Sequence, residues 1–434
     1  MARAKLKDQK AALLDARLEA MALPGGEAAW AVAAREAALT RLREMGLPHA
    51  RDEYWKYTRP DTLTSVEAPE AAVFDNGSER PIFDATERLR IVFVDGVFDE
   101  ASSDPLDMAG VEITRLSDAM SKDIHWVKDF YGDLEAGSHD PVQRPLAAFN
   151  TAFARDGVAI RVTGQAAKPV NLVYLHKDPT SDAILHNIVV LEEGADFTLL
   201  ENGPAAARFS KGLEVHVADG AAFHHVRAQG RDHERRAATG IFARLGKEST
   251  FKSFTLTVNG VLTRNECVIT LTGDDAIAHI AGACLGDGAD FHHDDTVFIT
   301  HDAVNCESRQ VFKKVLRNGA TGVFQGKILV QPGAQKTDGY QISQSLLLDD
   351  DSQFYAKPEL EIYADDVACS HGSTSGAIDE TGLFYLRSRG VPEAEATDLM
   401  TLAFLSEALD EIDDDALADD MRARLEAWLK RRRG

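Results

Sequence analysis

The chain has 434 residues, and its 47 Lys and Arg side chains stand against 70 Asp and Glu, for a formal net charge of −23 at pH 7. A balance this acidic argues against a nucleic-acid-binding protein, whose binding surface is basic. No run approaches the ~18 apolar residues of a membrane helix and no signal-peptide pattern opens the chain, so we expect a cytoplasmic protein without a membrane partner.

The first region is predicted to be helical and mixed. Residues 1 to about 46 are rich in Ala, Leu, Glu and Arg, a composition that favours helix. Within them, Pro24-Gly25-Gly26 separates two helices. An aromatic segment follows at Trp55–Thr58, and the clearest strand of this region is Leu89–Val94. Because a chain this long exceeds the ~250–300 residues of a single core, we assign 1–115 to a separate N-terminal region.

The middle region, 116–390, is predicted to be a β-solenoid. Short strand-like runs follow one another from Val158 to Tyr363, and glycines recur at intervals near 14 residues or twice that. Strands at such regular spacing over about 200 residues are typical of a sandwich, barrel or solenoid, and this length favours the solenoid. A solenoid of this kind has two open ends whose strand edges invite a partner.

The last region, 391–434, is predicted to form two helices separated by Asp413-Asp414-Asp415. Apolar residues recur every three to four positions along the first helix, and a second stripe ends near Trp428. The stripe consists of Leu399, Leu402, Leu405 and Leu409, with Trp428 on the second helix. From the pattern alone, a cap on the solenoid end and a docking module for a partner are equally good interpretations.

The best candidate site consists of Cys369 and His371. One residue separates them, so on a strand both side chains point to the same face. A thiolate and an imidazole suit a soft or borderline metal, but two ligands do not complete a tetrahedral site. The surrounding sequence is polar and rich in turns, unlike that of a buried structural cysteine. A metal-ligand role and a nucleophile role both remain open at this point.

Other chemical groups give weaker signals. His293 and His301 could meet across neighbouring strands close to Asp294 and Asp295, but without a third ligand we favour a solvated polar face. The chain has four cysteines and no CxxC motif, and Cys267 and Cys284 lie in apolar sequence typical of buried thiols. No P-loop, HExxH or GxSxG motif indicates an enzyme.

The residues from about 310 to 391 carry a specific resemblance. The segments FQGKI, AQKTDGYQ, SLLLDDD, KPELEIYADDV, CSHG and LFYLRSRG occur in this order between Phe324 and Gly390. Together they closely resemble the SufB/SufD family of iron–sulfur cluster assembly scaffolds, more loosely from Asn150 through the strand region and into the final helices. The short helical N-terminus and the segment at Trp55–Thr58 are similar to those of SufD rather than SufB members.

This resemblance implies a mainly β fold: a right-handed parallel β-helix flanked by N-terminal and C-terminal helical regions. It implies a non-enzymatic scaffold that pairs with SufB and the SufC ATPase, with the helices of 391–434 as the SufC dock. It also implies that His371, with Cys369 beside it, holds a transient iron–sulfur cluster shared with SufB. We expect no firmly bound cofactor in the isolated chain, and a homodimer of that isolated chain remains open.

Two alternatives accompany this hypothesis. A stand-alone β-helix enzyme acting on polysaccharide is motivated only by the solenoid pattern, and predicts carboxylates and basic residues converging on one solenoid face. A SufB-like chain that receives sulfur by itself would need an accepting thiol, for which Cys306 and Cys369 are the candidates.

Overall fold

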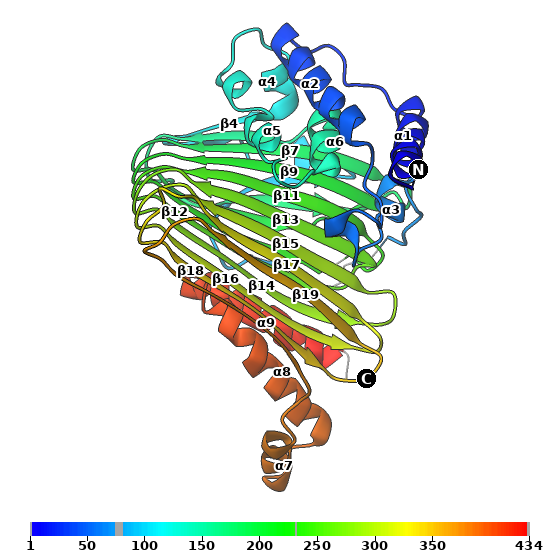
Figure 1. Ribbon diagram of the computed structural model, residues 1–434, viewed down its shortest axis with the longest axis vertical. Helices are drawn as coiled ribbons and strands as arrows, with labels where there is room; N and C mark the ends of the chain where they lie inside the picture. Colours follow the sequence, from blue (N-terminus) through cyan, green and yellow to red (C-terminus); the bar gives the residue numbers. More distant parts are fainter. Residues whose placement is uncertain (1, 74–80, 231, 432–434) are drawn as a thin grey trace.

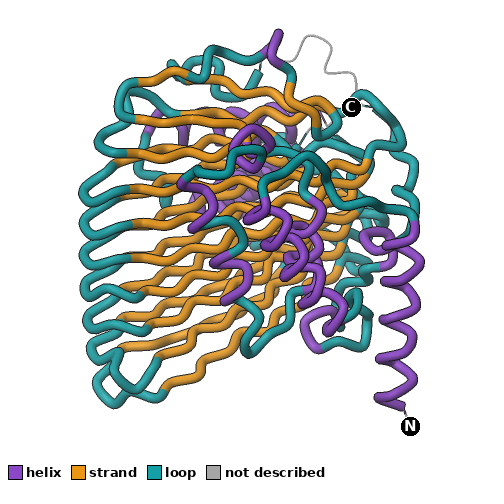
Figure 2. Tube along the Cα trace, turned by 90° about the horizontal axis from the view of Figure 1, so that it is seen from above, coloured by secondary structure: helices purple, strands orange, loops and turns teal. Residues whose placement is uncertain are grey.

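The structure, a computed structural model, describes residues 2–73, 81–230 and 232–431. In this part of the chain two ten-stranded sheets face each other, and the chain passes alternately from one to the other (Figure 1). Neighbouring strands within each sheet are parallel, apart from the short strands at the N-terminal end. Figure 2 shows the strands stacked like rungs with their turns aligned along one side. The predicted β-helix flanked by helices is therefore confirmed.

We call the two sheets A and B. In spatial order, sheet A contains β2 (Val97–Phe98), β1 (Leu89–Val94), β6 (Val170–Leu175), β8 (Asp196–Asn202), β10 (Ala222–Gln229), β12 (Thr250–Val258), β14 (Ile277–Asp287), β16 (Glu307–Arg317), β18 (Asp338–Leu347) and β20 (Ala368–Gly376). Sheet B contains β19 (Gln353–Ile362), β17 (Thr321–Val330), β15 (His292–His301), β13 (Leu262–Leu271), β11 (Arg236–Leu245), β9 (Arg208–Val217), β7 (Asp182–Leu191), β5 (Val158–Val162), β4 (Val111–Arg115) and β3 (Asp107–Met108).

One turn of the β-helix contains one strand from each sheet. The register advances by 26 residues from Arg236 to Leu262 and by 32 residues from Thr321 to Gln353. This repeat explains the glycine spacing in the sequence, because glycines such as Gly194 and Gly220 occupy turns at positive φ, which side chains disfavour. Alternate residues of each strand point into the space between the sheets, which we call the lumen, and an apolar core fills most of it.

Helices cover the outer faces of both sheets. The N-terminal group is α1 (Ala2–Glu19), α2 (Ala29–Met45), α3 (Asp61–Thr64), α4 (Leu116–Met120), α5 (Asp133–Gly137) and α6 (Pro145–Phe153), with short 3-10 turns at Glu53–Trp55, Glu100–Ser102 and Trp126–Asp129. It gathers over the first turns, where α6 packs on β7 and β9 (Figure 1). At the other end are α7 (Glu380–Ser388), α8 (Glu393–Leu409) and α9 (Asp415–Arg431), and α8 lies against β14 and β16 of sheet A. No helix of the described ranges is long and apolar enough to cross a membrane.

The region boundaries differ from the predicted ones at both ends. β1 and β4 already belong to the two sheets, so the β-helix begins before residue 116. The C-terminal helices begin with α7 at Glu380, before residue 391. At the start the reason is that β1 and β4 are short strands, of six and five residues, which lack the strong periodicity of the middle.

Charged side chains attach the C-terminal helices to sheet A. Lys252 Nζ lies 2.7 Å from Asp413 Oδ1, and Glu411 lies 3.5 Å from His279 Nδ1 and 3.3 Å from Arg309. These basic residues belong to one row on successive strands of sheet A: His224, Lys252, His279 and Arg309. The predicted acidic break at 413–415 is therefore the turn between α8 and α9, and it is held on the sheet.

Candidate functional site at the open end of the β-helix

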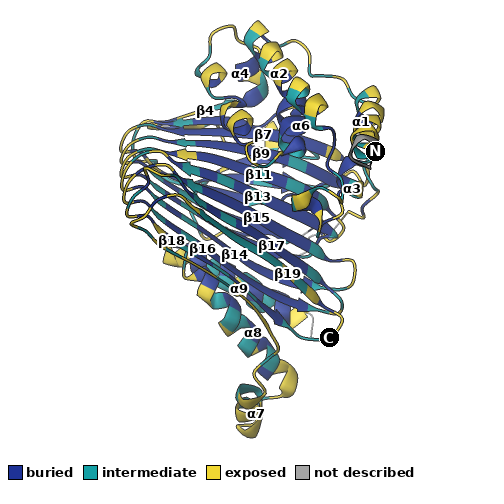
Figure 3. Cartoon of the chain, in the orientation of Figure 1, coloured by how far each residue is buried: buried dark blue, intermediate teal, exposed yellow. Residues whose placement is uncertain are grey.

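The two sheets end in an exposed turn formed by β19 and β20. Each is the last strand of its sheet, so one edge of each has no strand beside it within the described residues. Most residues of β19 and β20 are half-buried or exposed, whereas the strands before them are largely buried (Figure 3). Cys369 and His371 both lie on β20, with one residue between them, as the sequence predicted.

Cys369 is half-buried at the margin of a small apolar cluster. Its neighbours there include Ile328 and Ala364, and its register partner on β18 is Gly339. A Cβ atom at Gly339 would lie 3.1 Å from the Cys369 sulfur, so the glycine leaves the space in which the thiol sits. Burial raises the pKa of the Cys369 thiol, against a backbone hydrogen bond from Gly339 that lowers it.

The other three cysteines, Cys267, Cys284 and Cys306, are buried. Burial raises the pKa of the Cys267 and Cys284 thiols to about 12, and it also raises that of Cys306. The expectation that Cys267 and Cys284 are packing residues is confirmed. Cys306, a candidate sulfur acceptor, is only 1% exposed, and its Sγ lies 3.3 Å from the carbonyl oxygen of Gly273.

Native thiol labelling should single out Cys369. We expect a bulky disulfide reagent to modify one thiol of the four in the folded chain, because only Cys369 is partly exposed. The labelling rate of Cys369 should still be rising at pH values at which an ordinary thiol is already ionised. The reason is that the raised pKa keeps the reactive thiolate scarce near neutrality. Absorbance of the thiolate released from the reagent measures the number of modified thiols and the labelling rate. Cys369→Ser should react negligibly, and rapid labelling of that variant would contradict the assignment.

His371 is exposed on the same strand. Two pairs of serines link β20 to β18 beyond it, with Oγ–Oγ distances of 3.1 Å for Ser343 and Ser373 and 2.9 Å for Ser345 and Ser375. The lumen therefore becomes polar at this end, and His371 stands at its mouth. Within the described ranges no group of three or more His, Cys, Asp or Glu is placed to hold a metal ion. Cys369 and His371 are thus a pair of side chains with metal-binding chemistry, and no third such side chain joins them within the described ranges.

The expected docking stripe on the C-terminal helices needs a correction. Leu405, Leu409 and Trp428 are at most 3% exposed, because they pack with Phe254 and Leu256 on the outer face of sheet A. A partner cannot contact them while the helices stay in place. Leu402 is partly buried against the same cluster, and only Leu399, 46% exposed, faces outward.

Exposed apolar side chains on these helices lie instead around α7. Phe384 is 72% exposed and Tyr385 is 56% exposed, and α7 has no buried residue. Figure 1 shows α7 projecting away from the β-helix beyond α8. A helix that exposes two aromatic rings in this way indicates a contact surface for another molecule.

The pairing suggested for His293 and His301 is wrong. Both lie on β15, near its two ends, and therefore not on neighbouring strands. Neither lies on a solvated face. His293 is buried and its Nδ1 lies 2.8 Å from Lys314 Nζ, while His301 Nε2 lies 2.8 Å from Ser308 Oγ. Both side chains point into the lumen, because β15 runs from His292 to His301 and contains both histidines on one face.

The lumen also contains a buried ionic cluster that the sequence did not reveal. Glu201 is fully buried and forms an ion pair with Lys211. Its carboxylate also accepts a hydrogen bond of 2.8 Å from Tyr174 Oη and lies 3.1 Å from His225 Nε2. Burial would raise the pKa of the Glu201 carboxyl, but Lys211 and His225 outweigh it and hold the pKa well below its usual range. Alternation could have located this cluster, because Glu201, Lys211 and His225 all occupy inward positions of their strands.

Buried neutral histidines should make the fold sensitive to acid. Burial lowers the pKa of His301 to about 4, and burial outweighs Glu201 to lower that of His225 to about 4. Between pH 6.5 and 4 the unfolded chain therefore binds more protons than the folded chain, and stability falls as pH falls. From pH 7 to pH 5 each should remove roughly 2 kcal/mol from the free energy of unfolding. Urea unfolding at both pH values measures this loss. Between these pH values the His301→Leu variant should lose less of its free energy of unfolding than the unmodified chain. The control variant His224→Gln, at a partly exposed position, should lose as much as the unmodified chain.

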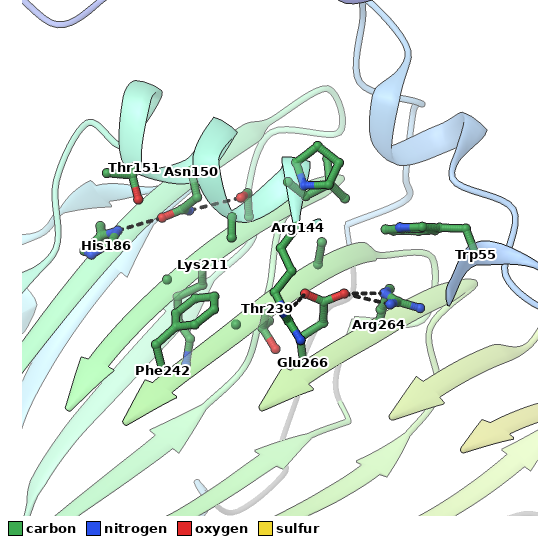
Figure 4. A pocket seen from close by; sticks show the side chains of 17 residues that line it. Trp55, Arg144, Asn150, Thr151, His186, Lys211, Thr239, Phe242, Arg264 and Glu266 are labelled. Carbon is green, nitrogen blue, oxygen red and sulfur yellow. Dashed lines mark hydrogen bonds and ion pairs between the residues drawn. The ribbon is translucent and has the colours of Figure 1, made fainter. Parts of the chain in front are cut away.

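A hollow lies between α6 and sheet B, and the charged side chains that line it form ion pairs. Figure 4 shows Glu266 between Arg264 and Arg144, with oxygen–nitrogen distances of 2.7 Å and 3.9 Å. On the other side His186 Nδ1 lies 2.9 Å from Asn150 Oδ1 of α6. This hollow is a packing contact between the N-terminal region and the β-helix, and the open end remains the candidate site.

Comparisons with known proteins identify the family of this chain. Residues 174–404 match the family model described as the SufBD core domain of SUF system FeS cluster assembly. The chain is 28% identical over 399 residues to the iron-sulfur cluster assembly protein SufD of Escherichia coli K12, covering 89% of this chain and 90% of that protein. It is 26% identical over 283 residues to the protein of the same name from Bacillus subtilis 168, covering 62% of this chain and 63% of that one. A SufBD family protein of Synechocystis is 26% identical over 427 residues, covering 92% of this chain and 91% of the relative. The chain therefore belongs to the SufB/SufD family of iron–sulfur cluster assembly proteins.

Proposed function

We propose that this chain is a non-catalytic scaffold subunit of iron–sulfur cluster assembly that supplies part of a cluster site and needs a partner to complete it. The observation that carries the proposal is the exposed last turn of the β-helix, which presents Cys369 and His371 on an edge strand. Imidazole and thiolate are both accepted ligands of iron–sulfur clusters. The E. coli relative is named for the same process. An incomplete ligand set suits a scaffold, because a cluster held by few ligands can be released.

The partner at this edge is proposed to be a SufB-type chain. β19 has ten residues and β20 has nine, so each offers a long edge to a strand of another chain. Such pairing would bring the partner's ligands next to His371. In the isolated chain the same edge would favour a homodimer. The cluster is then cargo built at the interface between two chains, and the proposed setting is the reducing cytoplasm.

The second partner is proposed to be the SufC ATPase, bound through the C-terminal helices. Phe384, Tyr385 and Leu399 supply the exposed apolar surface there. The rest of α8 and α9 is fixed on sheet A by the buried leucines and by ion pairs. A force applied to these helices would therefore act on β14 and β16 of sheet A, from which β20 is separated by β18, and this sheet links nucleotide-driven movement of an ATPase to the cluster edge.

Co-purification tests both contacts. Removing all residues after Gly390 would expose the apolar outer face of sheet A, so surface variants are the better instrument. We expect Phe384→Ser with Tyr385→Ser to lose at least ten-fold of the SufC retained on tagged chain, while the SufB-type partner stays bound. Ile124→Ser is a matched control, because Ile124 is 88% exposed far from α7 in the sequence. Undiminished SufC retention by the α7 variant would contradict docking at α7. Failure of the unmodified chain to retain either partner would contradict the scaffold role.

The polysaccharide-acting alternative is not favoured by the comparisons, since the matched relatives are named for cluster assembly. It also leaves the Cys369–His371 pair and the exposed face of α7 without a use.

A further inference from the structure

A ladder of two buried glutamines leads from the interior of the β-helix to His371. Gln310 on β16 aligns with Gln341 on β18, and Gln341 aligns with His371 on β20. The three side chains therefore form one row on the lumen face of sheet A, with backbones ~4.8 Å apart. Both glutamines are 0% exposed. The row ends inward at Ile280, the register partner of Gln310.

The hydrogen bonding of this ladder has a direction. Gln341 Nε2 donates to Gln310 Oε1 at 2.9 Å. Since the amide nitrogen of Gln341 faces Gln310, its Oε1 is turned away from Gln310, and the next side chain along the row is His371. This oxygen is buried and has no hydrogen-bond partner in the structure. A buried acceptor left unpaired costs ~1–3 kcal/mol, so its position calls for an explanation.

The space around Gln341 is built for its amide. Across the lumen lies Gly326 of β17, where a Cβ atom would be 2.3 Å from Gln341 Nε2. No side chain fits at residue 326 while the amide lies there. The neighbouring rows show that side chains of β18 and β20 are close enough to bond, because Ser343 reaches Ser373 and Ser345 reaches Ser375. Gln341 and His371 are the next polar pair on the same two strands.

We propose that Gln341 is a positioning residue for His371: when the cluster binds, Gln341 Oε1, which has no partner in this structure, accepts the hydrogen bond of one imidazole N–H, and the other ring nitrogen faces the cluster at the open edge. The inference rests on the proposed function, in which His371 is a cluster ligand. A histidine that binds a metal commonly donates its second ring nitrogen to an oxygen acceptor, which fixes the tautomer and makes the ligand more basic. Cys369 has no such support, since its register partner is Gly339.

The test uses the full chain co-purified with its SufB-type partner and the SufC ATPase, loaded anaerobically with ferric iron, dithiothreitol as reductant and sulfide. Two quantities are measured: the iron retained after a fixed exposure to EDTA, and the nitrogen hyperfine coupling of the reduced cluster by pulsed electron paramagnetic resonance. We expect Gln341→Leu to lose the cluster to EDTA ~10- to 100-fold faster, as for other residues that support a metal ligand. The nitrogen coupling should weaken or become heterogeneous. Gln341→Glu, which keeps an acceptor oxygen, should restore both readouts.

Controls separate this inference from a structural effect and from the proposed function. Ser343→Ala removes a hydrogen bond between the same two strands without touching His371, and should behave as the unmodified chain. If the Gln341→Leu variant does not co-purify with the partner, Gln341→Met is measured in its place. If His371→Ala loses the nitrogen coupling while the Gln341 variants keep iron and coupling unchanged, the positioning role is overturned and the ligand role stands. If His371→Ala itself keeps both, the ligand role fails first.

Discussion

Glu201→Ala is expected to lower the free energy of unfolding by about 3–5 kcal/mol, the usual cost of removing one partner of a buried ion pair. Glu201 faces the lumen on β8 and is the carboxylate that Lys211 and His225 contact there. Arg227 adds a further positive charge, with its NH1 3.9 Å from Glu201 Oε2. Without Glu201, two buried cations would lose this neutralising charge. Burial already outweighs Glu201 and lowers the pKa of Lys211 to about 8, so Lys211 is then expected to lose its proton.

Denaturant unfolding followed by circular dichroism measures the effect. Glu193→Ala, at an exposed position in the turn before β8, is the matched control and should change stability by no more than ~0.5 kcal/mol. The double variant Glu201→Leu with Lys211→Met removes both charges and should recover part of the loss, since apolar residues often replace a buried ion pair at little cost. A Glu201→Ala midpoint equal to that of the unmodified chain would show that the cluster contributes little to stability.

The sequence predicted the repeating part of the fold because each turn of the β-helix repeats one local pattern. Strand-like runs and turn glycines such as Gly194 and Gly220 report that pattern directly. The same alternation placed Cys369 and His371 on one face of one strand. These predictions needed only neighbouring residues, and they were confirmed by the structure.

What the sequence could not predict depends on which surfaces meet. The apolar stripe of Leu405 and Leu409 left a cap on the solenoid end and a docking surface open, and it did not indicate that the outer face of sheet A covers it. The Trp55–Thr58 segment was noted without a location. It lies across sheet B, where the Trp55 ring stacks on the Arg264 guanidinium at 4.2 Å. Tyr57 stacks on Tyr355 of β19 at 5.0 Å between ring centroids. Contacts between residues 209 and 298 positions apart leave no periodic signal in either segment.

His371→Ala is expected to abolish cluster formation by the assembled complex while leaving the complex intact. The side chain is exposed on the edge strand, so its removal creates no cavity and leaves the β18–β20 pairing in place. Cys369→Ser should have a smaller effect, because the sulfur is half-buried against Gly339 and its apolar neighbours rather than turned fully outward. The two variants thus compare the cluster content lost with the exposed His371 and with the half-buried Cys369.

The measurement is iron and acid-labile sulfide per complex after anaerobic loading, with partner stoichiometry determined on the same sample. Ser370→Ala is the control on the same strand, since Ser370 lies between Cys369 and His371 and points to the other face. It should keep the full content of iron and sulfide. An unchanged cluster in His371→Ala with a lost cluster in Cys369→Ser would reverse the assignment and make the thiol the principal ligand. A cluster that survives both changes would place the ligands on the partner chain, and would leave this chain a purely mechanical role between that partner and the ATPase.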